Sequence, residues 1–398
     1  MTFTEFPLQR HAAAAGRRRR RTPRLLVQLD RPADAFANIG PNWFACVMGT
    51  GIVANAAALL PVSIVGLRTA ALVVWMAAAV LLVLISAATA VHWLRYRETA
   101  RGHALNPSMA PFYGAPPMAL LTVGAGALLV GRNLIGLHCA VVVDSILWGL
   151  GTATGLLAAA AIPYLMFTRQ RLDQSMTLGS WLMAVVPPMV SAATGAALVS
   201  HLAAGQAQRL LLLGCYAMFG LSLVASLVII TLLWARLAYN GPGPAETVPT
   251  LWIVLGPLGQ SITAANLLAS QSSHVISATY APTFQALGVV YGMPVWGFAM
   301  LWLAVAAAIT IRTARSRLPF TLTWWSFTFP VGTVVTGTSE LALHTDLTAL
   351  TVAAVGLYVL LVLAWLAAAV NTTRGVVTGR LLRPLVATTS PCRQPIGA

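Results

Sequence analysis

The hydrophobic pattern of this chain is a series of ten apolar stretches separated by short polar loops. The stretches cover residues 41–60, 69–94, 113–130, 135–167, 179–203, 209–236, 249–270, 283–311, 319–343 and 347–370. Most of them reach the roughly 20 residues that an α-helix needs to cross a bilayer, and the others come close. The pattern therefore predicts an all-α integral membrane protein with ten transmembrane helices.

A short motif recurs in every second stretch. Its variants are Val47-Met48-Gly49-Thr50, Pro117-Met118-Ala119-Leu120, Pro188-Met189-Val190-Ser191, Pro257-Leu258-Gly259-Gln260 and Pro330-Val331-Gly332-Thr333. Their first residues are 70, 71, 69 and 73 positions apart. A regular period of this length indicates an internal repeat. We therefore expect five helical hairpins, each with a first helix broken by glycine or proline and a smoother second helix.

Proline or glycine within a span frees backbone groups that hydrocarbon cannot satisfy. Such breaks are tolerated where a helix is buried in protein or borders a watery cavity. The five broken helices are thus predicted to form a central pore, with the five smoother helices outside against lipid. The predicted pore-lining residues are Gly49, Thr50, Pro117, Pro188, Ser191, Gly256, Pro257, Gln260, Pro330, Gly332 and Thr333.

One aromatic residue stands out next to these motifs. The residues that come just before the five tetrads are Cys46, Pro116, Pro187, Gly256 and Phe329. If they form a ring, Phe329 is its only bulky member, which makes it a candidate steric gate. Phe327, two residues earlier, is the competing candidate, and ordinary packing is the alternative for both.

Two acidic residues lie well within the apolar stretches, Asp144 and Glu340. A charged side chain at the centre of a bilayer costs about 2.5–3.5 kcal/mol on insertion scales, so neither should face lipid. Each is interpreted either as a proton-linked group in transport or as a structural group that holds helices together.

The charge distribution supports a membrane topology. Only 8% of residues are charged, against about 25% in soluble domains. Nine arginines follow even-numbered stretches and three follow odd-numbered ones, which places both termini in the cytoplasm of a cell-membrane protein. The net charge of +15 therefore reflects topology and does not indicate a nucleic-acid partner. We expect a disordered basic tail over 1–40, a membrane domain over 41–372 and a C-terminal tail over 373–398.

Several chemistries lack the residues that they require. The chain contains no lysine, so it has no phosphate-binding loop of the kind that drives ATP-dependent transport. Its four cysteines are not paired in spacing, and no cluster of acids or histidines suggests a metal site. The sequence therefore predicts neither an enzyme nor a bound cofactor.

Several motifs together resemble a known transporter family. They are the aromatic segment Trp324–Pro330, the stretches Trp43–Gly51, Leu255–Gln260 and Thr328–Thr333, and the downstream Glu340. Over roughly 37–372 the chain is similar to the tellurite-resistance/dicarboxylate transporters, which include slow-type anion channels and fungal malate and sulfite transporters. The motifs look most similar to those of the sulfite efflux pumps, where Asp144 also has an acidic equivalent.

The resemblance implies a homotrimer in which each protomer has its own pore, closed by a phenylalanine of the ninth helix. We assign that role to Phe329, with Phe327 as the alternative. It also implies transport of small anions, with sulfite export as the leading expectation and C4-dicarboxylate transport or tellurite resistance as alternatives. A membrane receptor or scaffold that conducts nothing is the alternative from another functional class.

Overall fold

The computed structural model describes residues 32–170, 173–277 and 279–383 of the chain. The arginine run and most of the predicted N-terminal tail lie outside these residues, as does the end of the C-terminal tail. Every regular element that the described ranges contain is a helix, which confirms the all-α class. In these ranges eight helices are long and apolar enough to cross a membrane, or nine if a pair bent by 49° counts as one span. The chain is therefore a multi-pass membrane protein.

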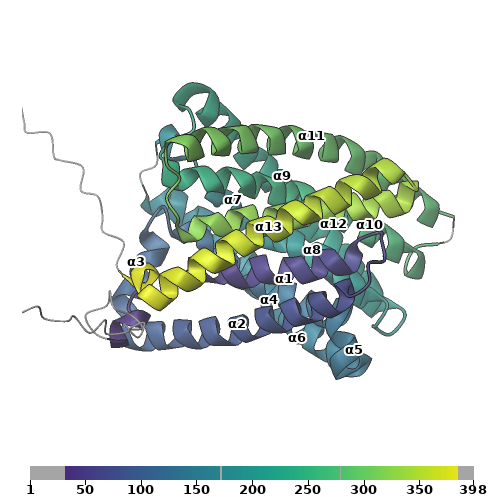
Figure 1. Cartoon of the computed structure of the whole chain (residues 1–398). Coiled ribbons are helices and arrows are strands. Elements are labelled where there is room, and N and C mark those ends of the chain that lie inside the picture. The colour runs from purple at the N-terminus through teal and green to yellow at the C-terminus, as the bar shows by residue number, and fades with distance from the viewer. Residues whose placement is uncertain (1–31, 171–172, 278, 384–398) are drawn as a thin grey trace, which may run out of the picture.

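The longest helices form the outer layer of the bundle (Figure 1). They are α2 (Leu67–Arg95), α6 (Leu137–Arg169), α9 (Gln206–Asn240), α11 (Ala281–Ser316) and α13 (Thr348–Thr378). Only 17–28% of their most apolar windows is buried within the protein. Since such large apolar surfaces are unstable in water, these faces are suited to contact with lipid.

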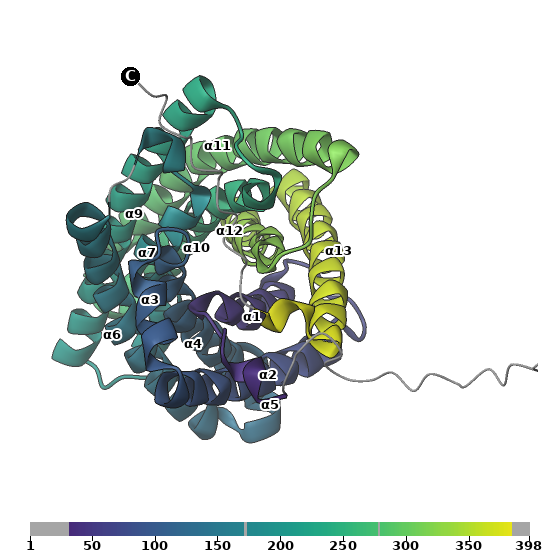
Figure 2. The same cartoon turned by 90° about the vertical axis from the view of Figure 1, so that its left-hand side faces the viewer.

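A second set of helices lies inside this layer, as the view along the bundle shows (Figure 2). They are α1 (Phe44–Leu59), α4 (Ala115–Gly126), α8 (Pro187–Val199), α10 (Leu255–Gln271) and α12 (Phe329–Thr345). In the spans that contain α1, α4 and α10, 83%, 61% and 89% of the most apolar window is buried. In α12, which is shorter than the eight counted helices, all residues from Phe329 to Ala342 are buried.

Each inner helix follows a short segment of tighter helix. These 3₁₀ segments are η2 (Pro41–Trp43), η3 (Ala110–Gly114), η6 (Gly179–Trp181, followed by α7, Leu182–Val185), η7 (Ala245–Val254) and η9 (Leu322–Phe327). Pro188 and Pro330 are the second residues of their helices, and Pro117 and Pro257 the third. The first N–H groups of a helix have no intrahelical acceptor, so proline costs no hydrogen bond there. In the spans of α4, α10 and α12 the predicted break is thus a change from 3₁₀ to α-helix. In the span of α8 it is a bend of 49° between α7 and α8.

The first span differs from the prediction. Helix α1 continues without interruption through Val47–Thr50, so the break expected at Gly49 is wrong. Glycine keeps its backbone N–H, so by itself it does not end a helix as proline does. Gly49 instead allows close packing, because a Cβ atom there would lie 2.7 Å from the Trp325 ring of η9.

The inner helices α10 and α12 also approach each other through glycine. A Cβ atom on Gly259 would overlap the backbone of Thr333 on α12. The Thr333 hydroxyl donates a hydrogen bond to the Leu255 carbonyl of α10 at 3.2 Å. The atoms of α12 that a larger residue at position 259 would meet belong to the backbone. Unlike a side chain, the backbone has no flexible end that could move away. This contact fixes the distance between the two helices near their N-terminal ends.

We predict that Gly259→Ala destabilises the protein by about 1–3 kcal/mol through overpacking, and more if the helices separate. Gly297→Ala on α11 is the matched control, since a Cβ there would meet nothing within 4 Å. Thermal unfolding in detergent should show a lower Tm for Gly259→Ala and an unchanged or slightly higher Tm for Gly297→Ala. Equal Tm values for the two variants would contradict the packing described here.

Candidate functional site

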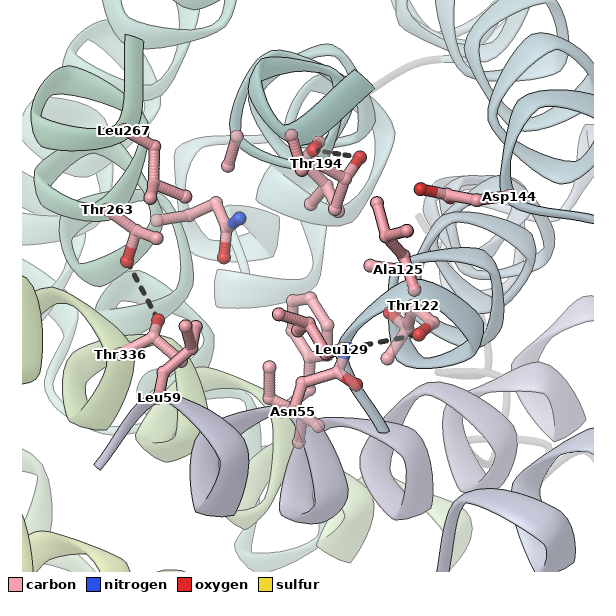
Figure 3. Close-up of a pocket in the computed structure, with 17 residues that line it drawn as sticks. Asn55, Leu59, Thr122, Ala125, Leu129, Asp144, Thr194, Thr263, Leu267 and Thr336 are labelled. Atoms are coloured by element: carbon pink, nitrogen blue, oxygen red, sulfur yellow. Dashed lines mark hydrogen bonds between the residues drawn. The ribbon is translucent and has the colours of Figure 1, made fainter. Parts of the chain in front are cut away.

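The inner helices enclose a central cavity of about 100 Å³ (Figure 3). All five inner helices contribute to it, together with outer helix α6 and η4 (Ala127–Gly131), a π-helical turn that continues α4. The lining consists of Ile52, Asn55, Leu59, Thr122, Ala125, Leu128, Leu129, Asp144, Val190, Ala193, Thr194, Ala197, Gln260, Thr263, Leu267, Phe329 and Thr336. Apart from Asp144, every side chain in this lining is neutral.

The polar groups of the lining are largely engaged with one another or with backbone. The hydroxyls of Thr263 and Thr336 are 2.8 Å apart and join α10 to α12. The Asn55 amide donates to the Thr122 carbonyl at 3.0 Å, which joins α1 to α4 (Figure 3). The Asn55 Oδ1 atom, however, is buried and finds no hydrogen-bond partner among the described residues. The cavity wall is therefore polar but weakly so.

The two candidate gate residues occupy different environments. Phe329 is the first residue of α12, is 2% exposed and lines the cavity. Phe327 ends η9 and packs edge-on against the rings of Trp252 and Trp324, with centroids 5.1 and 5.8 Å away. Of the two, Phe329 is thus the one in the cavity wall, and its role as a gate stays a prediction.

The hydroxyls at the fourth tetrad position face neighbouring protein. Thr50 donates to the Cys46 carbonyl at 2.7 Å and accepts from the Trp365 indole of α13 at 3.2 Å. Ser191 accepts from the Thr152 hydroxyl at 3.0 Å. Thr333 donates to backbone carbonyls of α12 and α10. Of the predicted residues at this position, Gln260 belongs to the cavity wall.

The predicted glycines also divide into two groups. Gly332 packs on Ile52, and Gly49 packs on η9, so both permit close contacts between elements. Gly256 is buried, yet a Cβ atom there would meet nothing within 4 Å. Gly256 therefore borders open space inside the bundle, and its pore-lining role stays a prediction. The tetrad prolines stand at helix starts, as described above, outside the lining of this cavity.

The two intramembrane acids are separated by the fold. Asp144 lines the cavity, is fully buried, and neither of its carboxyl oxygens has a hydrogen-bond partner among the described residues. Glu340 is outside the lining of this cavity, and its carboxyl lies 4.0 Å from the His344 ring one turn along α12. Sequence reasoning did not distinguish the two acids, because their distance from the cavity depends on helix packing.

A second cavity of about 460 Å³ adjoins the first. Its wall includes Arg132 of α5 (Arg132–Ile135), which lies at the end of the bundle away from the described chain ends (Figure 1). The two share Leu128, Leu129 and Ala197 in their walls. The second cavity carries Arg68 from the start of α2, Arg132 from the start of α5, and His201. In the sequence, Arg68 and Arg132 indicate only the membrane topology, although they are two of the three arginines that follow odd-numbered apolar stretches.

Comparison of the sequence with known protein families identifies the family of this chain. The model of the voltage-dependent anion channel family matches residues 38–373. The chain belongs to this family. The resemblance inferred from the aromatic and proline motifs is thereby confirmed, and the family consists of anion channels and transporters.

Known relatives in this family cover most of the chain. An uncharacterized transporter, MJ0576 of Methanocaldococcus jannaschii, is 24% identical over 360 residues, covering 90% of this chain and 99% of the relative. The sulfite efflux pump SSU1 of Trichophyton rubrum is 26% identical over 320 residues, covering 77% of this chain and 82% of the pump. The corresponding pump of Arthroderma benhamiae is 25% identical with the same coverage.

Proposed function

We propose that this protein carries small inorganic anions through the central cavity and that sulfite is its main substrate. The observation that carries the proposal is the junction of the two cavities. An electropositive cavity holding Arg68 and Arg132 adjoins a narrow cavity whose wall is almost entirely neutral. Positive charge at an entrance concentrates anions, and a weakly polar interior lets them pass without being held.

The interior supports a small anion over a dicarboxylate. Recognition of two carboxylates calls for fixed cations, typically arginine in a bidentate pair. Within the described ranges, the lining of the central cavity contains no arginine or histidine. The sulfite efflux pumps among the relatives support the same substrate class. Partial positive charge at the starts of α8, α10 and α12 would add attraction for an anion.

The proposal includes a topology and an assembly. All ten helical segments cross the cell membrane as five hairpins, with η9 and α12 together forming the ninth. Both termini lie in the cytoplasm, as the arginine distribution indicates. Three copies assemble, each with its own pathway, as the family resemblance implies. The second cavity, with Arg68 and Arg132, then opens on the extracellular side.

The substrate is tested with purified protein in liposomes under imposed gradients of sulfite, malate, nitrate and chloride. We expect sulfite flux well above that of protein-free liposomes and little or no malate flux. Malate transport without sulfite transport would overturn the substrate assignment. Liposomes without flux of any of these anions, even with the gate variant below, would favour a receptor or scaffold.

The gate is tested by Phe329→Ala, because removing the ring opens the cavity wall at the start of α12. We expect anion flux to rise at least roughly tenfold, equivalent to a barrier lowered by about 1.4 kcal/mol. Phe327→Ala is the matched control and should leave flux near the wild-type value. Each edge-on ring pair that this control removes should cost about 0.5–1.5 kcal/mol of stability, visible as a lower Tm. The reverse pattern of flux would transfer the gate to Phe327.

The entrance is tested by the double variant Arg68→Gln/Arg132→Gln. We expect anion flux to fall several-fold at low ionic strength and less at high salt, where screening acts within about 10 Å or less. Arg209 is the third arginine that follows an odd-numbered apolar stretch, but it lies outside the second cavity. Arg209→Gln should therefore have little effect. A similar loss in both variants, or a loss independent of salt, would contradict attraction by the entrance arginines.

A further inference from the structure

We propose that the carboxyl group of Asp144 is an anion ligand within the pathway and serves in its protonated form. The inference rests on the proposed anion transport and adds a proton-dependent binding site to it. A carboxyl group in the wall of an anion pathway is unexpected, since its ionised form repels the transported ion. The surroundings of Asp144 explain how the group can take part.

Asp144 reaches the cavity through a gap between inner helices. It belongs to outer helix α6, yet it lines the central cavity. The gap lies beside Gly124 of α4, where a Cβ atom would be 2.7 Å from Asp144 Oδ1. Figure 3 shows the carboxyl pointing inward between Thr194 and Ala125. The missing side chain at Gly124 thus gives an outer helix access to the pathway.

Within the described part of the chain, nothing near Asp144 stabilises a negative charge. Both of its oxygens lack a hydrogen-bond partner among these residues. The hydroxyls of Thr122 and Thr194, which share the cavity wall with Asp144, donate to the Met118 and Val190 carbonyls at 2.6 and 2.9 Å. An unpaired buried carboxylate is costly, whereas a neutral carboxylic acid carries a donor of its own.

The titratable groups around this site are few. Helix α4, its continuation η4 and helix α8 contain none, and Asp144 is the one titratable residue in the described cavity lining. Behind α8, helix α9 carries Cys215, whose sulfur lies 4.0 Å from the Ser191 carbonyl. Beyond η4, Arg68, Arg132 and His201 lie in the adjoining cavity, and His138 and Cys139 lie near the start of α6. Asp144 is therefore the group whose protonation changes the charge of the cavity wall.

The chemistry follows from these contacts. The protonated acid donates its O–H to an anion in the cavity, and no other bond forms or breaks. Loss of the proton to water leaves a carboxylate that expels the anion. Anion binding and protonation of Asp144 therefore favour each other to the same extent, as linkage requires. Small monovalent anions that accept one hydrogen bond, such as nitrate or hydrogen sulfite, fit this site.

The test is nitrate flux in liposomes as a function of pH, because nitrate does not change its charge over the range used. We expect wild-type flux to fall as pH rises, approaching about tenfold per pH unit once the carboxyl ionises. Asp144→Asn, which is neutral at every pH and keeps a donor, should hold the high flux throughout. Glu340→Gln is the matched control, since Glu340 lies outside this cavity lining, and should keep the wild-type pH dependence.

Infrared difference spectra of wild type against Asp144→Asn provide a readout that does not depend on transport. We expect a C=O stretch of a protonated carboxyl group, assigned to Asp144, that shifts when nitrate is added. The inference would be overturned if Asp144 were ionised at neutral pH and its spectrum did not change with nitrate. It would also be overturned if Asp144→Asn kept the wild-type pH dependence of flux. A nitrate-sensitive stretch without any flux would instead retain the binding site and reject the proposed transport.

Discussion

The need to satisfy every backbone hydrogen bond away from water determines the architecture of this protein. Hydrocarbon offers no partner for a free carbonyl or N–H group, so a helix that changes geometry within the membrane must be surrounded by protein. Four inner helices carry proline in their first turn, three of them after a 3₁₀ segment and α8 after a bend, and all five lie behind a layer of long, continuous helices. The outer layer supplies the apolar surface, and the inner layer is free to be irregular.

Much of this architecture could be predicted from the sequence because the constraints are local. The apolar stretch 41–60 corresponds to Pro41–Leu59 and the stretch 347–370 to Thr348–Thr378, since apolar length alone identifies a span. Proline marked four helix starts for an equally local reason. The prediction failed at Gly49, where glycine was read as a break although it retains its N–H group.

The site was less accessible to sequence reasoning because it depends on how each helix is rotated about its axis. The repeat aligned Thr50, Ser191 and Gln260, but the first two bond to neighbouring protein and only Gln260 reaches the cavity. Asp144 is the opposite case. It lies on a helix of the outer layer, and its access depends on an absent side chain at Gly124 on another helix. The sequence around Asp144 therefore contains no periodic pattern that would indicate its access to the cavity.

The contact between Gly259 and the Thr333 backbone has a further consequence for how the membrane influences the protein. Helices held by direct backbone contact cannot separate without breaking that contact. The gate proposed at Phe329 needs only a rotation about its own side-chain bonds, which would leave the cross-section of the protein in the bilayer plane unchanged. Lateral tension performs work only through a change in that area. A gate of this kind would therefore be insensitive to stretching of the surrounding lipid.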